Sequence, residues 1–330
     1  MRMLITGAAG FIGSNYVRKL LTGAYPRHTH AHVTVLDKLT YAGNPANLAA
    51  VAGHPRLTLV TGDITDTALL ADLVPGHDTI INFAAETHVD RSITGAAPFI
   101  HTNVTGTHTL LEAARTARTP RFLQVSTDEV YGSITTGSWT EDHPLQPNSP
   151  YAASKAAGDL IARAYARTHG MNITITRCGN NYGPHQHPEK LIPLFITNLL
   201  DHRPVPLYGT GDNVRDWLHV DDHCRGIHLA LETGAPGETY NIGGGTELTN
   251  RHLTGLLLRA LDADPHLLHH VPDRPGHDHR YSLDDTKLRR LGYTPRVDFT
   301  TGLAATIAWY RDNRAWWQPL KNPAPADATT

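Results

Sequence analysis

The sequence predicts an α/β protein with a doubly wound parallel sheet and a smaller, partly interleaved C-terminal domain. Two observations support this prediction. Short apolar runs alternate with helical patterns through the first 130 residues, which is typical of parallel β-α-β units. The apolar runs are nearly continuous instead of alternating with polar residues, as expected for strands that helices cover on both faces.

Each strand of the sheet is expected at one of the apolar runs, and each crossover at a helical pattern between two runs. The expected strands cover residues 3–6, 33–36, 57–60, 79–83, 121–125 and 172–177. Helices are expected over residues 13–21 and 103–117, and around Tyr151 and Lys155.

The pattern loosens beyond Gly183 and Pro184, where short helices at 190–200 and 252–261 mix with short strands such as 238–242. We therefore expect two domains, one over residues 1–180 and a second, partly interleaved one over 181–320. The segment 321–330 is rich in Pro, Ala and Thr and is expected to be a disordered tail.

The composition is that of an ordinary globular protein, with 40% hydrophobic residues, 18% charged residues and a formal net charge of −2. This charge provides no basic surface for nucleic acid or for a membrane. No apolar run reaches the roughly 18 residues that a membrane span needs. Two cysteines, Cys178 and Cys224, do not make a disulfide framework, so a cytoplasmic location is expected.

Histidine is abundant, with 22 residues, but most are scattered along the chain. One run, His28, His30 and His32, has alternating spacing and no cysteine or carboxylate beside it. Because the run falls between a helix and the next strand, we interpret it as a solvated loop, and no metal site is expected.

A glycine-rich segment, Gly7-Ala-Ala-Gly10-Phe-Ile-Gly13, follows the first strand and opens the first helix. Gly7 permits a tight turn, Gly10 lets the backbone approach a pyrophosphate, and Gly13 lets helix and strand pack closely. Free N–H groups at the helix start favour the phosphates. The pattern therefore predicts a Rossmann-type dinucleotide site in the first domain, to which Phe11 and Ile12 also contribute.

Asp37 ends the second expected strand and indicates which dinucleotide binds. A carboxylate at that position accepts hydrogen bonds from an adenosine ribose and would repel a 2′-phosphate, so NAD is favoured over NADP. An ordinary strand-end aspartate is the alternative. Further cofactor contacts are expected at Lys38, Thr40, Asp63, Ile64, Phe83, Ala84, Ala85, Thr102 and Asn181.

Tyr151 and Lys155 lie four residues apart and share one face of a helix that Ser149 and Pro150 would start. A nearby ammonium group and the positive ring of a nicotinamide both favour the phenolate over the phenol. Tyr151 could then take a hydroxyl proton as hydride leaves the same carbon, while Lys155 binds the nicotinamide ribose. Both residues are predicted to be catalytic and to contact the cofactor.

Thr127, Asp128 and Glu129 follow the fifth expected strand, at the edge where open α/β sheets bind ligands. The threonine hydroxyl can donate to a substrate oxygen, and the two carboxyl groups offer an acid and a base for elimination. Once a sugar is oxidised at carbon 4, Glu129 would remove the carbon 5 proton and Asp128 would protonate the departing carbon 6 hydroxyl. The hydride can then return to carbon 6. The alternative is that the carboxylates only cap a turn.

Three segments, 7–13, 126–132 and 151–155, resemble the extended short-chain dehydrogenase/reductases. The triplet 127–129 is similar to that of the dTDP-glucose 4,6-dehydratases within that family, as are segments 83–92, 180–184, 189–193 and 215–219. The resemblance implies a NAD-dependent hydro-lyase acting on dTDP-glucose, with Asp128 as acid, Glu129 as base and Tyr151 as redox base. It also implies a homodimer formed through the long helices that begin near Asn103 and Tyr151.

Two arginines, Arg215 and Arg274, stand in otherwise uncharged stretches and could grip a diphosphate through paired N–H donors. From the residues alone, surface salt bridges explain them equally well. The resemblance adds segments that would pack on the base or contact the sugar. The expected substrate contacts are Thr87, Thr127, Asn180, Glu189, Lys190, Leu191, Pro206, Tyr208, Arg215, Asn250, Arg274 and His277.

Three other functions remain open. A nucleotide-sugar 4-epimerase needs NAD and the Tyr/Lys pair, but it leaves Asp128 and Glu129 idle. A UDP-uronate decarboxylase resembles this chain but usually carries Ser in place of Asp128. An NAD-sensing regulator could dispense with Tyr151 and Lys155, which this chain retains.

Overall fold

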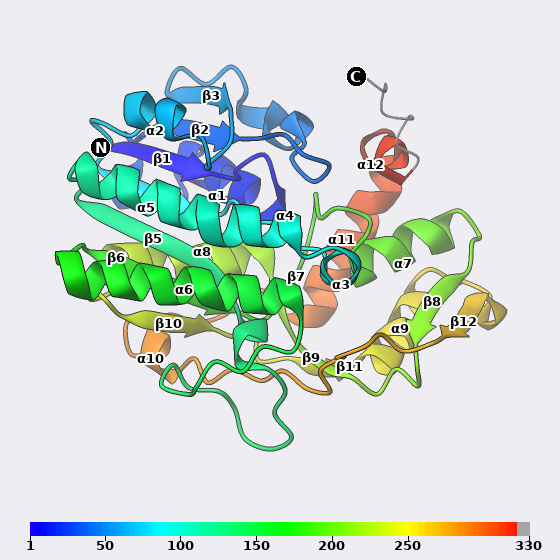
Figure 1. The fold of residues 1–330 in the computed structure, drawn as a ribbon. Coiled ribbons are helices and arrows are strands. Elements are labelled where there is room, and N and C mark those ends of the chain that lie inside the picture. Colours follow the sequence, from blue (N-terminus) through cyan, green and yellow to red (C-terminus); the bar gives the residue numbers. More distant parts are fainter. Residues whose placement is uncertain (322–330) are drawn as a thin grey trace.

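The computed structural model describes residues 1–321, which fold around a seven-stranded parallel sheet with helices on both faces (Figure 1). The strands lie in the order β10-β6-β5-β4-β1-β2-β3, and every neighbouring pair is parallel. The predicted doubly wound sheet is confirmed, with a strand at each expected run. The strands are β1 (Arg2–Thr6), β2 (His32–Asp37), β3 (Leu57–Thr61), β4 (Thr79–Asn82), β5 (Arg121–Thr127), β6 (Ile173–Cys178) and β10 (Thr239–Ile242).

Alternate residues of the central strands enter two separate cores. Met3 and Ile5 of β1 belong to one core, and Leu4 between them belongs to the other. Because both faces of the sheet are covered, the strands read as continuous apolar runs in the sequence. The first core includes α1 (Phe11–Leu21) and α8 (Val220–Thr233), and the second includes α2 (Thr67–Leu73), α5 (Thr107–Thr116) and α6 (Pro150–His169).

The helix expected over 103–117 begins earlier and is irregular. It starts as α4 (Ala97–Ile100), passes through a π-helical segment (His101–Gly106) and continues as α5. Within the π-helical segment, the Asn103 amide bonds both the N–H and the carbonyl of Glu86, at 2.9 and 3.0 Å. This pair of bonds holds the segment that follows β4 against the helix.

The C-terminal part of the chain builds a smaller unit with its own apolar core, on the right in Figure 1. It contains two short sheets, ordered β11-β9-β7 and β12-β8. Across residues 1–321, none of the helices combines the length and the apolar character needed to cross a membrane. The elements are β7 (Asn180–Tyr182), α7 (Leu191–Leu200), β8 (Val205–Tyr208), β9 (Val214–His219), β11 (Glu247–Thr249), α9 (Asn250–Ala260), β12 (Leu268–Val271), α11 (Phe299–Asp312) and α12 (Arg314–Lys321).

Two placements from the sequence need correction. The strand over 238–242 was expected in the C-terminal domain, but β10 pairs with β6 at the edge of the large sheet, with Thr239 opposite Ile175. The chain therefore returns to the first unit through α8 and β10. Lys321, expected in a disordered tail, ends helix α12, and the remainder of that tail lies outside the described residues.

A row of buried polar side chains crosses the otherwise apolar sheet. The Thr6 hydroxyl donates to Asn82 Oδ1 at 2.6 Å, and Asn82 Nδ2 donates to Gln124 Oε1 at 2.8 Å. The three residues stand opposite one another on β1, β4 and β5, and each is at most 1% exposed. Because a one-residue slip would turn these side chains to the other face and leave their polar atoms unpaired, the row fixes the register of three strands.

The variant Asn82→Leu is expected to lower the free energy of unfolding by about 2–5 kcal/mol, because it leaves a buried hydroxyl and a buried amide without partners. Urea denaturation followed by circular dichroism measures the loss. The triple variant with Thr6→Val, Asn82→Leu and Gln124→Leu is the matched control and should recover more than half of it, since none of the three side chains then leaves another of them unpaired and only the long 3.4 Å bond from the Ala84 N–H is lost. An equal loss in both variants would contradict the interpretation.

Candidate active site

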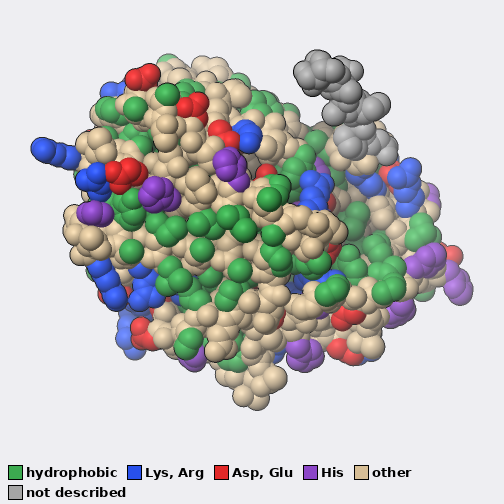
Figure 2. All heavy atoms as spheres, in the orientation of Figure 1, with side chains coloured by type: hydrophobic (Ala, Val, Ile, Leu, Met, Phe, Trp, Pro, Cys, Tyr) green, Lys and Arg blue, Asp and Glu red, His purple; other side chains and the backbone are tan. Residues whose placement is uncertain are grey.

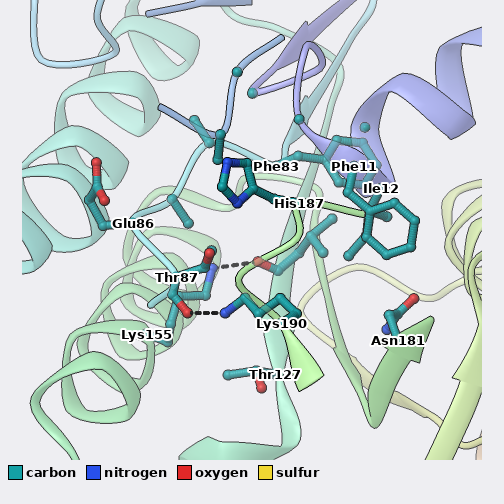
Figure 3. A pocket seen from close by; sticks show the side chains of 18 of the residues that line it. Phe11, Ile12, Phe83, Glu86, Thr87, Thr127, Lys155, Asn181, His187 and Lys190 are labelled. Carbon is teal, nitrogen blue, oxygen red and sulfur yellow. Dashed lines mark hydrogen bonds between the residues drawn. The ribbon is translucent and has the colours of Figure 1, made fainter. Parts of the chain in front are cut away.

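A cavity of about 340 Å³ lies where the carboxyl ends of the strands meet the smaller unit. It extends from the glycine turn at Gly7 and the end of β2 at Asp37 to Tyr151 at the start of α6 and Lys190 in the smaller unit. Figure 3 shows side chains from both units directed into this space. Carboxyl ends of parallel strands are where open α/β sheets bind ligands.

A different physical constraint accounts for glycine at each of the three positions in the first turn. Gly7 has φ +67°, and a Cβ there would lie 2.5 Å from the backbone nitrogen of Ala84. A Cβ on Gly13 would lie 2.7 Å from Ala8 Cα, so helix and strand could not pack as they do. A Cβ on Gly10 would meet only the Gly7 carbonyl oxygen, at 3.2 Å. Packing therefore explains glycine at position 10 less well than the space that a missing side chain leaves in the cavity.

The start of α1 is suited to an anion. Gly10 precedes the helix, no side chain caps its N-terminus, and its first turn carries no acidic residue. The first-turn N–H groups of a helix lack partners within the helix, and the helix dipole places positive potential there. A pyrophosphate group therefore fits this end of the cavity.

Asp37 joins the end of β2 to the glycine turn. Its carboxylate accepts the Ala9 N–H and the Leu39 N–H, both at 2.8 Å. Burial raises its pKa, and the two backbone bonds oppose that rise. Close by, Lys38 and Asp63 form an ion pair at 2.7 Å. Asp37, Lys38 and Asp63 line this end of the cavity, near the ends of β2 and β3.

Tyr151 and Lys155 share one face of α6, as predicted. Ser149 caps the helix by accepting the Ala152 N–H at 3.1 Å. Tyr151 is 7% and Lys155 5% exposed, and both line the cavity. The Lys155 ammonium donates to the carbonyl of Val125 at 2.7 Å, which ties α6 to β5.

The pKa of Tyr151 in the chain without ligand is governed by burial and by the neighbouring residues Glu129 and Thr127. Burial raises the pKa of Tyr151 well above its usual value, the nearby Glu129 raises it further, and a hydrogen bond with Thr127 opposes this. The Lys155 ammonium is bonded to a backbone carbonyl, and burial lowers its own pKa.

Thr127, Asp128 and Glu129 form the junction between β5 and a short 3-10 turn. The Thr127 hydroxyl caps this turn by accepting the Glu129 N–H at 3.3 Å, and it also lies 3.3 Å from Asp128 Oδ1. The turn directs both carboxyl groups into the lining of the cavity. Asp128 is 2% exposed, and its Oδ2 has no hydrogen-bond partner within residues 1–321.

The two carboxyl groups lie in different electrostatic environments. Burial raises the pKa of Asp128 well above its usual value, and Glu129 and Asp216 raise it further. Burial also raises the pKa of Glu129, but Arg274, Lys190 and Arg215 all oppose that rise. Neighbouring titratable groups with unlike environments are the arrangement that assigns one as acid and the other as base.

Two residues of the smaller unit fix its loop against the cavity. The Lys190 ammonium donates to the carbonyl of Thr87 at 2.7 Å (Figure 3). Glu189 accepts a hydrogen bond from Tyr41 at 3.0 Å and pairs with Arg91 at 3.4 Å. Segments about 100 residues apart in sequence are thus bonded at one wall of the cavity.

Arg215 and Arg274 lie beyond the cavity lining but influence Glu129, as noted above. Arg215 is 5% exposed, stacks on the Tyr281 ring at 4.2 Å and donates to the carbonyls of Val214 and Asp278. It therefore makes no surface salt bridge. Arg274 does pair with a carboxylate, that of Asp90, at 3.4 Å.

The structure brings most of the predicted residues into one cavity, and leaves a second group outside its lining. All the predicted catalytic and cofactor residues line it, as do Thr87, Asn180, Glu189, Lys190 and Leu191. The expected substrate residues outside the lining are Pro206, Tyr208, Arg215, Asn250, Arg274 and His277.

Sequence reasoning missed several residues of the lining, among them Glu86, His187 and Trp217. Glu86 had a usable signal, because it stands between predicted residues at the end of β4. His187 and Trp217 gave none, since long-range packing alone brings them to the cavity.

Comparison with known proteins places the chain in a family. A sequence model of the family described as GDP-mannose 4,6 dehydratase matches residues 4–306. The chain belongs to this family. Its resemblance to the dTDP-glucose 4,6-dehydratases is likewise confirmed.

Individual proteins of similar sequence and structure agree with this placement. A dTDP-glucose 4,6-dehydratase of Streptomyces niveus is 59% identical over 334 residues, covering 99% of both chains. The crystal structure of a dTDP-glucose 4,6-dehydratase from Streptomyces venezuelae, with NAD and dTDP bound, has a TM-score of 0.96 at 64% identity and covers 97% of this chain and 100% of that one. A UDP-glucose 4-epimerase from Thermotoga maritima has a TM-score of 0.86 at 31% identity, covering 94% and 99%.

The variant Asp128→Asn is expected to gain stability over the unchanged chain as pH rises from 5 to 8. The folded chain raises the pKa of Asp128, so the stability linked to its proton is present below the unfolded pKa of about 4 and is lost as pH rises through the folded pKa. Asparagine does not titrate. Urea denaturation at pH 5, 6.5 and 8 measures the difference in unfolding free energy, and a difference independent of pH would contradict the raised pKa.

Proposed function

We propose that the chain is an NAD-dependent dTDP-glucose 4,6-dehydratase, a hydro-lyase that converts dTDP-glucose into dTDP-4-keto-6-deoxyglucose. The observation that carries the proposal is the pair of buried carboxyl groups, Asp128 and Glu129, in the same cavity as Tyr151. The 59% identity to a dehydratase over nearly the whole chain supports it independently.

The glycine-turn end of the cavity fits NAD. The uncapped start of α1 suits the pyrophosphate, the open side of Gly10 leaves room for it, and the Asp37 carboxylate suits an adenosine ribose. When bound, NAD accepts a hydride from carbon 4 of the sugar and returns it to carbon 6. We assign further contacts with NAD to Gly7, Phe11, Ile12, Gly13, Lys38, Thr40, Asp63, Ile64, Phe83, Ala84, Ala85, Thr102, Tyr151, Lys155 and Asn181, all of which line the cavity.

The side chains of the cavity then handle protons in sequence. Tyr151 takes the proton of the carbon 4 hydroxyl, whose oxygen Thr127 holds by a hydrogen bond, and Lys155 binds the nicotinamide ribose. Glu129 takes the proton of carbon 5, which the carbon 4 ketone has made acidic. Asp128, whose raised pKa keeps it protonated, gives its proton to the departing carbon 6 hydroxyl, which leaves as water.

The substrate would extend from this point into the smaller unit. We propose that Arg215 and Arg274 bind the diphosphate, because the charges of both act on the Glu129 carboxyl at the elimination site. The remaining proposed substrate contacts are Thr87, Thr127, Asn180, Glu189, Lys190, Leu191, Pro206, Tyr208, Asn250 and His277.

The carboxyl pair also argues against the alternative functions. A UDP-glucose 4-epimerase shares the fold, with a TM-score of 0.86, so the fold alone does not separate the two reactions. Epimerisation transfers a hydride from and to carbon 4 and gives Asp128 and Glu129 nothing to do. Burial of two unused carboxyl groups side by side would cost stability without return. A regulator that only senses NAD has the same difficulty, and would not need Tyr151.

We also propose a division of labour along the chain and a homodimer. Residues 1–180, joined by α8 and β10, would bind NAD and carry the catalytic side chains, and the rest of 181–320 would bind the nucleotide sugar. Hydrophobic side chains gather on the face formed by α4, α5 and α6 (Figure 2), where Ile100 of α4 and Leu160 of α6 are each 53% exposed. An apolar face of this kind suits pairing with a second copy. The free, buried cysteines fit a cytoplasmic location.

The variant Gly10→Ala is expected to weaken NAD binding at least about tenfold while leaving the melting temperature of the cofactor-free chain nearly unchanged. Its φ of −74° suits alanine, and the added Cβ meets only one protein atom, the Gly7 carbonyl oxygen at 3.2 Å, which a small shift of the turn relieves. Calorimetry of NAD binding and a thermal melt check the two effects. Gly7→Ala is the matched control, which must lose stability because of its positive φ and the 2.5 Å approach to Ala84. Unchanged NAD affinity in Gly10→Ala would contradict the cofactor placement.

Incubation with dTDP-glucose, UDP-glucose and GDP-mannose side by side tests the function. We expect loss of one water from dTDP-glucose by mass spectrometry, without net consumption of NAD. An isomer of unchanged mass would mean epimerisation, and loss of carbon dioxide from a UDP-uronic acid would mean decarboxylation.

Two variants test the assigned roles in the same assay. Glu129→Gln should slow product formation at least about 100-fold while reduced nicotinamide accumulates, because oxidation precedes the blocked proton removal. Tyr151→Phe should form neither product nor reduced nicotinamide. Glu141→Gln, a half-buried glutamate outside the cavity whose pKa burial also raises, is the control and should keep its activity. Full activity of both test variants would refute the roles.

A further inference from the structure

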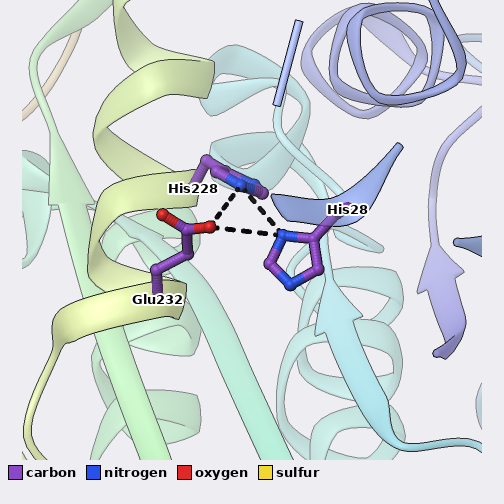
Figure 4. Close-up of side chains that lie close together, drawn as sticks. All are labelled: His28, His228 and Glu232. Carbon is purple, nitrogen blue, oxygen red and sulfur yellow. Dashed lines mark hydrogen bonds and ion pairs between the residues drawn. The ribbon is translucent and has the colours of Figure 1, made fainter. Parts of the chain in front are cut away.

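Three side chains that the proposed dehydratase reaction does not use meet beside the sheet (Figure 4). His28 ends a short 3-10 turn between α1 and β2, while His228 and Glu232 stand one turn apart on α8. His28 Nδ1 lies 3.2 Å from His228 Nε2, and Glu232 Oε1 lies 3.4 Å from each of these nitrogens. The three atoms therefore form a nearly equilateral triangle, although 200 residues separate the two histidines.

We propose that His28, His228 and Glu232 bind one divalent transition-metal ion, and that Zn²⁺ is the ion that fits best. Tetrahedral zinc holds nitrogen and oxygen ligands at about 2.0–2.2 Å, which places the ligand atoms about 3.3–3.5 Å from one another. The triangle already has these dimensions, so zinc could bind with little rearrangement. The fourth position would be left to water or another small ligand.

The His228 ring is fixed in the orientation that such a site needs. The Tyr16 hydroxyl lies 2.8 Å from His228 Nδ1, and the Tyr25 ring stacks on the imidazole at 3.8 Å between centroids. These contacts leave Nε2 directed at the other two ligands. Metal-binding histidines commonly have their second ring nitrogen bonded in this way.

The exposure of the three side chains also suits a metal site. Glu232 is 18%, His28 15% and His228 7% exposed, so an ion could enter but would be largely shielded from water. Two imidazoles and one carboxylate select zinc and its neighbours among the transition metals over Mg²⁺ and Ca²⁺, which prefer oxygen ligands.

The position of the triangle indicates a structural role. It joins the α1–β2 connection, which leads into the start of a strand, to α8 on the same face of the sheet. None of the three residues lines the cavity at the carboxyl ends of the strands. The ion would therefore fasten α8 to the N-terminal β-α-β unit. Much of the smaller unit lies between these two parts in the sequence. The histidine run beginning at His28, interpreted from sequence as a solvated loop, would thus contribute one ligand.

Metal titration of the full-length protein tests the proposal. After removal of metals with a chelator, dialysis against buffered Zn²⁺ should leave one zinc per chain by elemental analysis. Zinc should raise the melting temperature by roughly 3–5 °C, whereas Mg²⁺ should not. Cobalt(II) in place of zinc should give the visible absorption bands of a tetrahedral site.

Variants separate this site from adventitious binding by other histidines. Glu232→Gln keeps the shape of the side chain and removes its charge. Glu232→Gln and His28→Gln, made separately, should each lose the bound zinc, the melting shift and the cobalt bands. His30→Gln, which changes an exposed histidine of the same loop, is the matched control and should keep all three. Circular dichroism verifies that each variant is folded.

The proposal fails if the unchanged protein retains no zinc, or if Glu232→Gln retains as much zinc as the unchanged protein. Dehydratase activity is measured in parallel and should stay within about twofold in metal-free Glu232→Gln, since the triangle lies outside the cavity. Loss of zinc with retained activity is the expected combination. Absence of dehydratase activity in the unchanged protein would instead refute the proposed function and leave the metal result standing.

Discussion

The row formed by Thr6, Asn82 and Gln124 is the interaction on which the active site depends. In a sheet that is apolar on both faces, hydrophobic contacts alone distinguish poorly between neighbouring registers, whereas a buried hydrogen-bonded row allows only one. Gln124 stands three residues before Thr127, so the same row decides where β5 ends relative to β1 and β4. The row therefore places the turn that carries Asp128 next to the glycine turn. A shift of β5 by one residue would displace this turn and reverse the direction of its side chains.

Burial at the end of β5 has different consequences for the carboxyl groups of Asp128 and Glu129. Burial, Glu129 and Asp216 raise the pKa of Asp128 and favour its protonated form, and Arg215 opposes them with a smaller effect. Glu129 is buried as well, but three cations of the smaller unit act on it and favour its charged form. A single turn of chain thus carries a proton donor and a proton acceptor, because the smaller unit directs three cations at Glu129 but sets the carboxylate of Asp216 against the effect of Arg215 at Asp128.

Features that are decided by residues close together in the chain could be predicted from the sequence, whereas features decided by residues far apart could not. The strands and the glycine turn depend on residues close together in the chain, and so does the shared face of Tyr151 and Lys155. The return of β10 to the large sheet was missed because its pairing with β6 is decided by tertiary packing. The partner of the Lys155 ammonium was not foreseen for a related reason, because its bond to the carbonyl of Val125 depends on how α6 packs against β5.

If the proposed roles hold, Arg215 and Arg274 link substrate binding to proton removal by Glu129. Arg215 and Arg274, assigned to the diphosphate, are also among the groups that lower the pKa of Glu129 in the chain without ligand. A bound diphosphate would place negative charge beside these arginines and offset their effect on the carboxylate. The pKa of Glu129 would then rise, making it a stronger base only when the sugar is in place. A charge cluster that weakens the base in the empty cavity is therefore consistent with elimination, because substrate binding would itself offset the weakening.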